Sequence, residues 1–180
     1  VDTLNEKFSD WNSNVSPESI DLKSVNRQKF SRIFLINKPG AVQSYITAGQ
    51  LIPPNNSDDD IVIDYANYAI AGSFTSRLNM NLREDKSWSY GARAGINSSK
   101  GQRLMVVRAP VQTDKTAESI QEILKEYNNY LNSEPINEEE LDKIKRARTL
   151  RLPGQYETLG AMMSGIENIV TNNRDFNYLN

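Results

Sequence analysis

The chain has 180 residues, which suits one domain with a hydrophobic core of its own. Its 21 basic and 23 acidic residues nearly cancel, so a net charge of −2 gives no electrostatic reason to expect nucleic acid or an acidic membrane as a partner. The absence of cysteine excludes disulfides, and the absence of histidine excludes a Ser-His-Asp triad and a histidine-ligated zinc on this chain.

The N-terminus predicts the end of an amphipathic helix. Apolar residues recur at helical spacing within residues 3–11. Val1 begins neither a signal peptide nor a bilayer-spanning apolar run, and the chain starts without methionine. The tail, residues 171–180, has no periodicity and no stop signal. We therefore interpret residues 1–180 as one domain that is truncated at both ends.

Two apolar segments follow, separated by a turn. The run RIFLI occupies Arg32 to Ile36 and is typical of a strand buried on both faces. After the turn signal Lys38-Pro39-Gly40, residues 42–49 alternate between apolar and polar. We predict an antiparallel hairpin of residues 31–37 and 42–49.

Three successive aspartates, Asp58 to Asp60, precede an apolar helix predicted over residues 61–71. The start of a helix favours negative charge, so we interpret the aspartates as capping residues. A calcium loop needs alternating ligands and a glycine, and this spacing lacks both.

A second helical piece is predicted over residues 74–84, and two paired strands over residues 90–97 and 104–111. The first of these strands should place four side chains on one face: Tyr90, Ala92, Ala94 and Ile96.

Three helices end the chain. Residues 117–131 carry an apolar stripe, and residues 159–169 carry another. Between them, Asn137 with Glu140 predicts a capping box, which argues against Glu139 and Glu140 as catalytic acids. The whole order predicts an α+β fold, with a mostly antiparallel sheet backed on one face by helices.

Arg83 and Tyr90 are the residues with the most chemical potential. An arginine offers five donors to carbonyls or carboxylates, and a neutral tyrosine hydroxyl can donate to an oxyanion. This pair can hold a peptide and stabilise a carbonyl, but it supplies no nucleophile. A structural alternative remains open, in which Arg83 pairs with Glu84 or Asp85 and Tyr90 packs in the core.

The surrounding residues make the pattern specific. Residues 72–92 read GSFTSRLNMNLREDKSWSYGA, residues 8–11 read FSDW, residues 38–44 read KPGAVQS, and residues 139–147 read EELDKIKRA. In this order they resemble the second homologous domain of zinc peptidases of the pitrilysin/insulinase family, in the processing-peptidase-like branch. The resemblance covers nearly the whole chain.

The resemblance implies a metallohydrolase (processing-peptidase-like) domain. In the family, one domain binds zinc through a His-x-x-Glu-His motif and a later glutamate, and the second domain faces it across a chamber. The second domain contributes an arginine and a tyrosine seven residues apart, which Arg83 and Tyr90 match. The tyrosine is placed to bind the scissile carbonyl, and the arginine to hold the substrate backbone.

We therefore expect the non-catalytic half of a zinc metallopeptidase, inactive alone. The expected partners are a peptide substrate and a zinc-binding homologous domain, on the same polypeptide or a separate subunit. This chain should hold no metal itself. The resemblance also favours the bacterial periplasm or cell envelope over the cytoplasm. A structural subunit related to the family, without proteolytic function, is the alternative.

Two residues near the pair need separate expectations. Trp88 either lines the chamber or packs, and the sequence favours neither. Arg77 is expected to stabilise the corner between two helices rather than to touch substrate.

Overall fold

The computed structural model describes residues 2–12, 15, 18, 30–55, 59–99, 101–172 and 174–175. Its sheet has three antiparallel strands in the order β1-β3-β2. The central strand is β3 (Arg103–Gln112), which pairs with β1 (Gln43–Ile52) along its whole length and with the shorter β2 (Arg93–Ile96) on its other edge. The predicted α+β fold with a mostly antiparallel sheet is confirmed.

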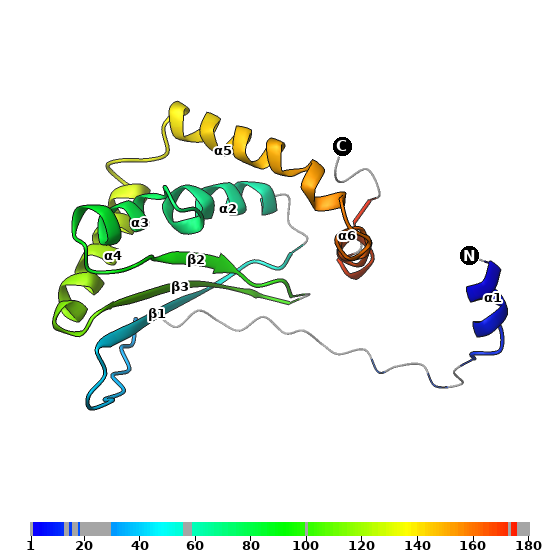
Figure 1. Cartoon of the computed structure of the whole chain (residues 1–180), viewed down its shortest axis with the longest axis horizontal. Coiled ribbons are helices and arrows are strands. Elements are labelled where there is room, and N and C mark those ends of the chain that lie inside the picture. The colour runs from blue at the N-terminus through cyan, green and yellow to red at the C-terminus, as the bar shows by residue number, and fades with distance from the viewer. Residues whose placement is uncertain are drawn as a thin grey trace.

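The helices gather on one side of this sheet. Figure 1 shows α2 (Asp60–Asn67), α3 (Arg77–Asn79) and α5 (Glu138–Arg151) above the strands, with α4 (Thr116–Leu131) closing the same side at one end. The remaining helices of the described part are α1 (Asp2–Phe8) and α6 (Leu159–Thr171), with short 3-10 turns at Thr113–Lys115 and Pro153–Tyr156. None of the described helices combines the length and the apolar character needed to cross a membrane.

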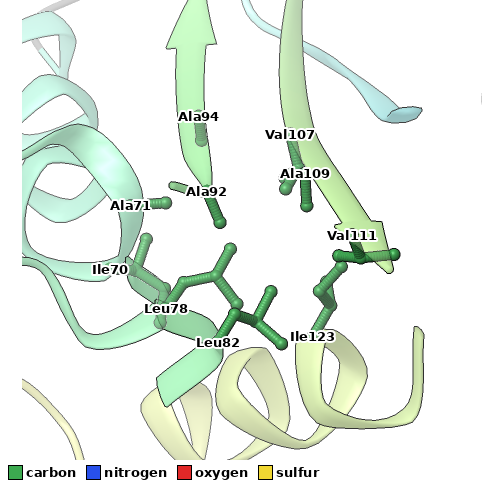
Figure 2. Close-up of a cluster of buried hydrophobic side chains, with 10 residues drawn as sticks. All are labelled: Ile70, Ala71, Leu78, Leu82, Ala92, Ala94, Val107, Ala109, Val111 and Ile123. Carbon is green, nitrogen blue, oxygen red and sulfur yellow. The ribbon is translucent and has the colours of Figure 1, made fainter. Parts of the chain in front are cut away.

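The hydrophobic core lies between the helices and one face of the sheet. Alternate residues of β2 and β3 point to this face, because side chains alternate along a strand. Figure 2 shows the cluster: Ile70, Ala71, Leu78, Leu82, Ala92, Ala94, Val107, Ala109, Val111 and Ile123. Small residues on β2 let the helical segments approach the strand closely.

The two helices before β2 form as predicted but widen at their ends. α2 continues as a π-helix over Tyr68–Gly72, and α3 continues as another over Met80–Asp85. A side chain at Gly72 would place its Cβ 3.2 Å from the carbonyl oxygen of Asn67, so the close turn favours glycine here. Wide turns of this kind often occur beside functional sites.

The predicted hairpin is wrong in its first strand. Residues 31–37 form no strand, and Leu35 and Ile36 are 87% and 88% exposed. β1 pairs with β3, which is distant in sequence, instead of with the neighbouring run. The physical reason is that RIFLI has apolar side chains on both faces, and no layer of the described fold covers either face of this segment.

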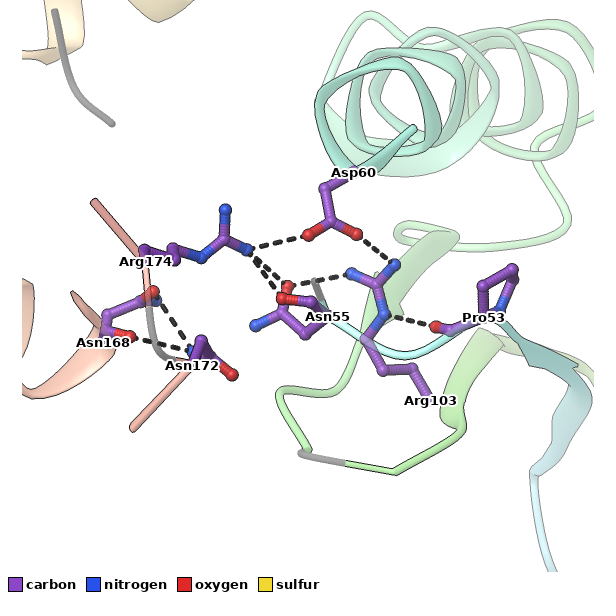
Figure 3. A network of polar contacts seen from close by, with 7 residues as sticks. All are labelled: Pro53, Asn55, Asp60, Arg103, Asn168, Asn172 and Arg174. Atoms are coloured by element: carbon purple, nitrogen blue, oxygen red, sulfur yellow. Dashed lines mark hydrogen bonds and ion pairs between the residues drawn. The ribbon is translucent and has the colours of Figure 1, made fainter. Parts of the chain in front are cut away.

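The described aspartates lie at a helix start, as predicted: Asp59 is the N-cap residue of α2, and Asp60 is in its first turn. Asp58 lies outside the described residues, and the Asp59 side chain makes no capping hydrogen bond. Asp60 is instead buried between two arginines, 2.7 Å from Arg103 and 2.8 Å from Arg174 (Figure 3). The sequence did not reveal that two guanidinium groups bind this carboxylate at the helix start.

The helices predicted in the C-terminal half are confirmed, but their apolar stripes are not the buried faces. Leu124 and Leu131 of the α4 stripe are 64% and 74% exposed, and α6 buries none of its residues. Asn137 accepts a hydrogen bond from the Glu140 amide at 2.9 Å, and its own amide donates to the Glu140 carboxylate at 3.1 Å. This is the predicted capping box, and α4 and α6 lie within a few residues of their predicted bounds. Local signals suffice here because both capping partners are close in sequence.

Replacing Asp60 by alanine should lower the free energy of unfolding by about 3–5 kcal/mol, since it leaves two buried arginines without their carboxylate. Urea denaturation at neutral pH measures this. The matched control is Asp142→Ala on the exposed side of α5, which should unfold at the wild-type urea concentration. Equal losses in both variants would contradict the assigned role of Asp60.

Tyr127 should make stability sensitive to alkaline pH. Burial raises the pKa of Tyr127 to about 12, and its hydroxyl has no hydrogen-bond partner among the described residues. An unfolded tyrosine ionises near pH 10, so between about pH 10 and 12 the unfolded chain loses a proton that the folded chain keeps. The free energy of unfolding should therefore fall through this window, and fall less steeply in Tyr127→Phe. Urea unfolding curves at a series of pH values test this, and identical slopes would refute it.

Candidate functional site

A closed backbone loop connects the π-helix at Met80–Asp85 to the strand region before β2. The Leu82 carbonyl accepts hydrogen bonds from the amides of Trp88 at 3.0 Å and Ser89 at 3.2 Å. Ser87 turns the chain with a φ of 54°, a left-handed value that is uncommon outside glycine. Arg83 follows one end of this loop and Tyr90 follows the other, so the backbone brings the two predicted site residues to one place.

The Arg83 side chain stacks on an aromatic ring. Its Cζ lies 4.1 Å from the ring centroid of Phe74, a distance at which a cation is attracted to the ring face. Its Nη1 lies 3.4 Å from the Glu84 carboxylate, as the structural alternative expected. That contact does not meet hydrogen-bond geometry, because the buried Nη1 has no hydrogen-bond partner among the described residues. Stacking thus orients the guanidinium while donors remain unused.

Tyr90 points out of the fold because the chain contains an extra residue next to it. Ser89 lies opposite Val111, and Arg93 lies opposite Arg108. Four steps separate Ser89 from Arg93, whereas three separate their partners, so residues 90–92 contain a bulge. Tyr90 is 88% exposed, which makes the structural alternative of a core tyrosine wrong. The prediction that it shares a face with Ala92 is wrong for the same reason.

Ser89 stabilises this bulge. Its hydroxyl donates to the Pro110 carbonyl at 2.6 Å and accepts from the Gly91 amide at 3.0 Å. The side chain therefore satisfies a backbone group next to Tyr90 and another on the neighbouring strand β3. Nothing in the sequence indicated a role for Ser89 beyond its place in the family-like stretch.

Asn79 is the second residue whose role the sequence did not reveal. Its amide nitrogen donates to the Phe74 carbonyl at 2.5 Å, and its oxygen accepts from the Ala92 amide at 2.9 Å. Asn79 thus connects Phe74, whose ring contacts Arg83, to Ala92, which directly precedes β2. The available signal was its position between Leu78 and Leu82, where a buried polar side chain needs partners.

Trp88 packs rather than projecting away from the fold. It lies half-buried against the hydrophobic core, with the amino groups of Lys86 and Lys115 at 5.7 and 5.9 Å from its ring centroid. Of the two roles that the sequence left open, the structure shows the packing one. Trp88 therefore supports the loop that carries Arg83 and Tyr90.

Arg77 stabilises a contact between helices, but not the predicted corner between the helices at residues 61–71 and 74–84. Its guanidinium binds the Glu140 carboxylate through two hydrogen bonds of 2.7 and 2.6 Å, and it also donates to the carbonyls of Glu134 and Pro135. These hydrogen bonds lower the pKa of Glu140 and raise the pKa of Arg77. Both residues are occupied in joining α3 to the start of α5, and Glu140 has no free carboxylate for acid catalysis.

The described residues include no group of three acidic, histidine or cysteine side chains that could hold a metal ion. The side chains of Arg83 and Tyr90 are hydrogen-bond donors. Chemically, this arrangement can grip backbone carbonyls and stabilise negative charge on an oxygen. It offers no nucleophile and no ligand set for zinc.

Solved structures share this fold. A peptidase M16 inactive domain from Pseudomonas fluorescens matches with a TM-score of 0.67 and 20% identity, over 77% of this chain and 33% of that chain. A protease from Helicobacter pylori matches at 0.70 and 19%, over 79% and 34%. The periplasmic protease PqqL from Escherichia coli matches at 0.61 and 16%, over 74% and 15%. The chain thus spans about a third or less of these proteins.

No curated protein sequence matches the chain significantly. A family model does, over residues 1–148, and its description is the peptidase M16 inactive domain. This match covers most of the chain, including the loop from Arg83 to Tyr90. The expected relation to the non-zinc-binding domain of zinc proteases is confirmed, and the chain belongs to the peptidase M16 inactive domain family.

Proposed function

We propose that this chain is the non-catalytic half of a zinc metallopeptidase, which binds and orients a peptide and stabilises its scissile carbonyl. The observation that carries the proposal is the bulge that exposes Tyr90 at one end of the closed loop, with the stacked guanidinium of Arg83 at the other end. A phenol that is 88% exposed contributes little to packing. It suits a group that reaches toward another molecule.

Tyr90 supplies the hydrogen bond to the carbonyl oxygen. A tyrosine hydroxyl is ordinarily protonated at neutral pH. It can donate a hydrogen bond to an oxygen that gains negative charge during attack. Donors of this kind act best when they are held before the reaction begins. Ser89 and the Leu82 carbonyl provide this support, since both bind the backbone next to Tyr90.

Arg83 holds the substrate backbone. The Phe74 ring restricts the guanidinium to one plane, so fewer rotamers are lost when a peptide binds. The Arg83 side chain is 33% exposed, and its guanidinium donors other than the buried Nη1 can bind peptide carbonyls in an extended segment. The two side chains thus divide the work, with Arg83 positioning the chain and Tyr90 contacting the reacting group.

The metal and the base that activates water come from a partner. This chain has no histidine and no cysteine, and its described acidic residues form no ligand set, so zinc does not fit here. The partner is a zinc-bearing homologous domain, on the same polypeptide or a separate subunit. The likeness to a periplasmic protease supports the bacterial periplasm or cell envelope as the compartment.

Tyr90→Phe in the complete enzyme should lower kcat on the order of 100-fold, the usual cost of one oxyanion donor. Peptide cleavage is measured at saturating substrate. Tyr156→Phe, a tyrosine of the short turn before α6, is the matched control and should cleave at the wild-type rate. Unchanged kinetics in Tyr90→Phe would favour the alternative, a structural subunit in which the tyrosine has no catalytic role.

Arg83→Gln should raise KM about tenfold and change kcat less, because a lost charge-assisted hydrogen bond costs at least about 1.4 kcal/mol of binding. Steady-state kinetics on one peptide separates the two constants. Arg146→Gln, which removes the same charge from the exposed side of α5, should leave KM unchanged. A fall in kcat alone would show that Arg83 acts on the reacting group instead.

A further inference from the structure

The face of the sheet away from the helices carries an open hollow of about 390 Å³. Residues of this face alternate with those of the core, so Arg93 and Arg108 point to it while Ala94 and Val107 point inward. Figure 1 shows no described helix on this side of the strands. The hollow is lined by Tyr45, Gly91, Arg93, Ala94, Gly95, Arg108 and Pro110.

Two arginines that line this hollow are direct neighbours on adjacent strands. Arg93 on β2 and Arg108 on β3 are register partners, and both side chains are exposed. Like charges at opposed positions of neighbouring strands destabilise a sheet. Neither guanidinium makes a hydrogen bond or ion pair with any residue that the structure describes, whereas Arg77, Arg103 and Arg148 each bind a carboxylate. The protein therefore concentrates positive charge here without neutralising it.

The space beside the arginines comes from residues with little or no side chain. A Cβ built on Gly95 would meet no atom within 4 Å, which shows that the volume above this strand is empty. Tyr45 and Pro110 are register partners on the other side, so an aromatic ring and a proline border the hollow. A planar carboxylate can enter between the two guanidinium groups, which present donors in a fork that matches its oxygens.

The hollow reaches the backbone next to Tyr90. Gly91 lines it and directly follows Tyr90, while Pro110 lines it and accepts the hydrogen bond of Ser89. A peptide held by Arg83 with its carbonyl at Tyr90 would extend over this part of the sheet. A residue near the cleaved bond would then face Arg93 and Arg108.

We propose that Arg93 and Arg108 form a carboxylate-binding subsite that selects peptides with an acidic group near the scissile bond. This inference rests on the proposed function, since it assigns the substrate class of the same site. The carboxylate belongs either to an Asp or Glu side chain or to the peptide C-terminus. Both present the same pair of oxygens to the arginines.

The test uses this chain and three peptides of one length. The first has a central Glu and an amidated end, the second has Gln in its place, and the third has Gln and a free C-terminal carboxylate. Calorimetry should show that at least one carboxylate peptide binds about tenfold more tightly than the amidated Gln peptide, as one charge-assisted contact would give. The peptide that gains affinity identifies which carboxylate is bound.

Variants then locate the preference. Arg93→Gln and Arg108→Gln should each remove most of the tenfold difference, and Arg146→Gln should preserve it. The Nε–Hε NMR signals of Arg93 and Arg108 in the wild-type chain should shift with the preferred peptide and not with the amidated Gln peptide. This readout does not depend on how well any variant folds.

Three results would overturn the subsite: equal affinity for all three peptides, no binding of any peptide, or an equal loss in Arg146→Gln. Failure of the proposed function looks different. In the complete enzyme, Tyr90→Phe should slow cleavage of the Glu and Gln peptides by the same factor, whereas the arginine variants should change only the ratio between them. Tyr90→Phe could leave turnover unchanged while the chain still preferred a carboxylate. That result would support the binding subsite and contradict the catalytic role of Tyr90.

Discussion

One extra residue between Ser89 and Arg93 determines what this domain can present to another molecule. A regular ladder would have placed Tyr90 on the same face as Ala92, within the core. The bulge turns Tyr90 outward. The Ser89 hydroxyl binds the Gly91 amide and the Pro110 carbonyl, so these backbone groups keep hydrogen-bond partners at the bulge. Bulges cost ladder regularity and are found where a side chain must be re-aimed. Here the re-aimed group is the tyrosine.

The fold supports this distortion with rigid parts on every side. Leu82 and Val111 are fully buried, and each lies directly behind the loop or the bulge. Asn79, also buried, bonds to the Phe74 carbonyl and to the Ala92 amide. Positions held by packing and by buried hydrogen bonds move little, and precise placement is what carbonyl stabilisation requires. Residues of the core therefore also hold the site in position.

The central strand β3 serves both faces of the sheet. Its inward residues, such as Val107 and Ala109, pack against the helices, while its outward residue Arg108 joins Arg93 over the open face. This division means that substitutions on the outer face can change peptide preference without disturbing the core. Under the proposed function, such substitutions would change which peptides the partner domain cleaves.

The elements that the sequence predicts well depend on local signals. The capping box of Asn137 and Glu140 and the helix α4 depend on residues a few positions apart, and both are confirmed. The predicted stripe of α4 is not its buried face, because Ile123 is buried while Leu124 is exposed. What the sequence missed involves distant partners: β1 pairs with β3 instead of residues 31–37, and Asp60, at the start of α2, also binds Arg103 and Arg174.

Arg83 and Tyr90 could be named from the family-like stretch, but their setting could not. The bulge appears only when the register of Ser89 against Val111 is compared with that of Arg93 against Arg108. The same comparison reveals the opposed arginines. Register depends on long-range pairing, which single-chain periodicity does not encode.

The most direct measurement is peptide cleavage by the zinc-bearing partner domain with and without this chain. We predict that the partner alone cleaves very slowly and that adding this chain restores cleavage. With the Tyr90→Phe chain, the cleavage rate should be lower on the order of 100-fold. Full cleavage by the partner in the absence of this chain would contradict the claim that the domain completes the active site.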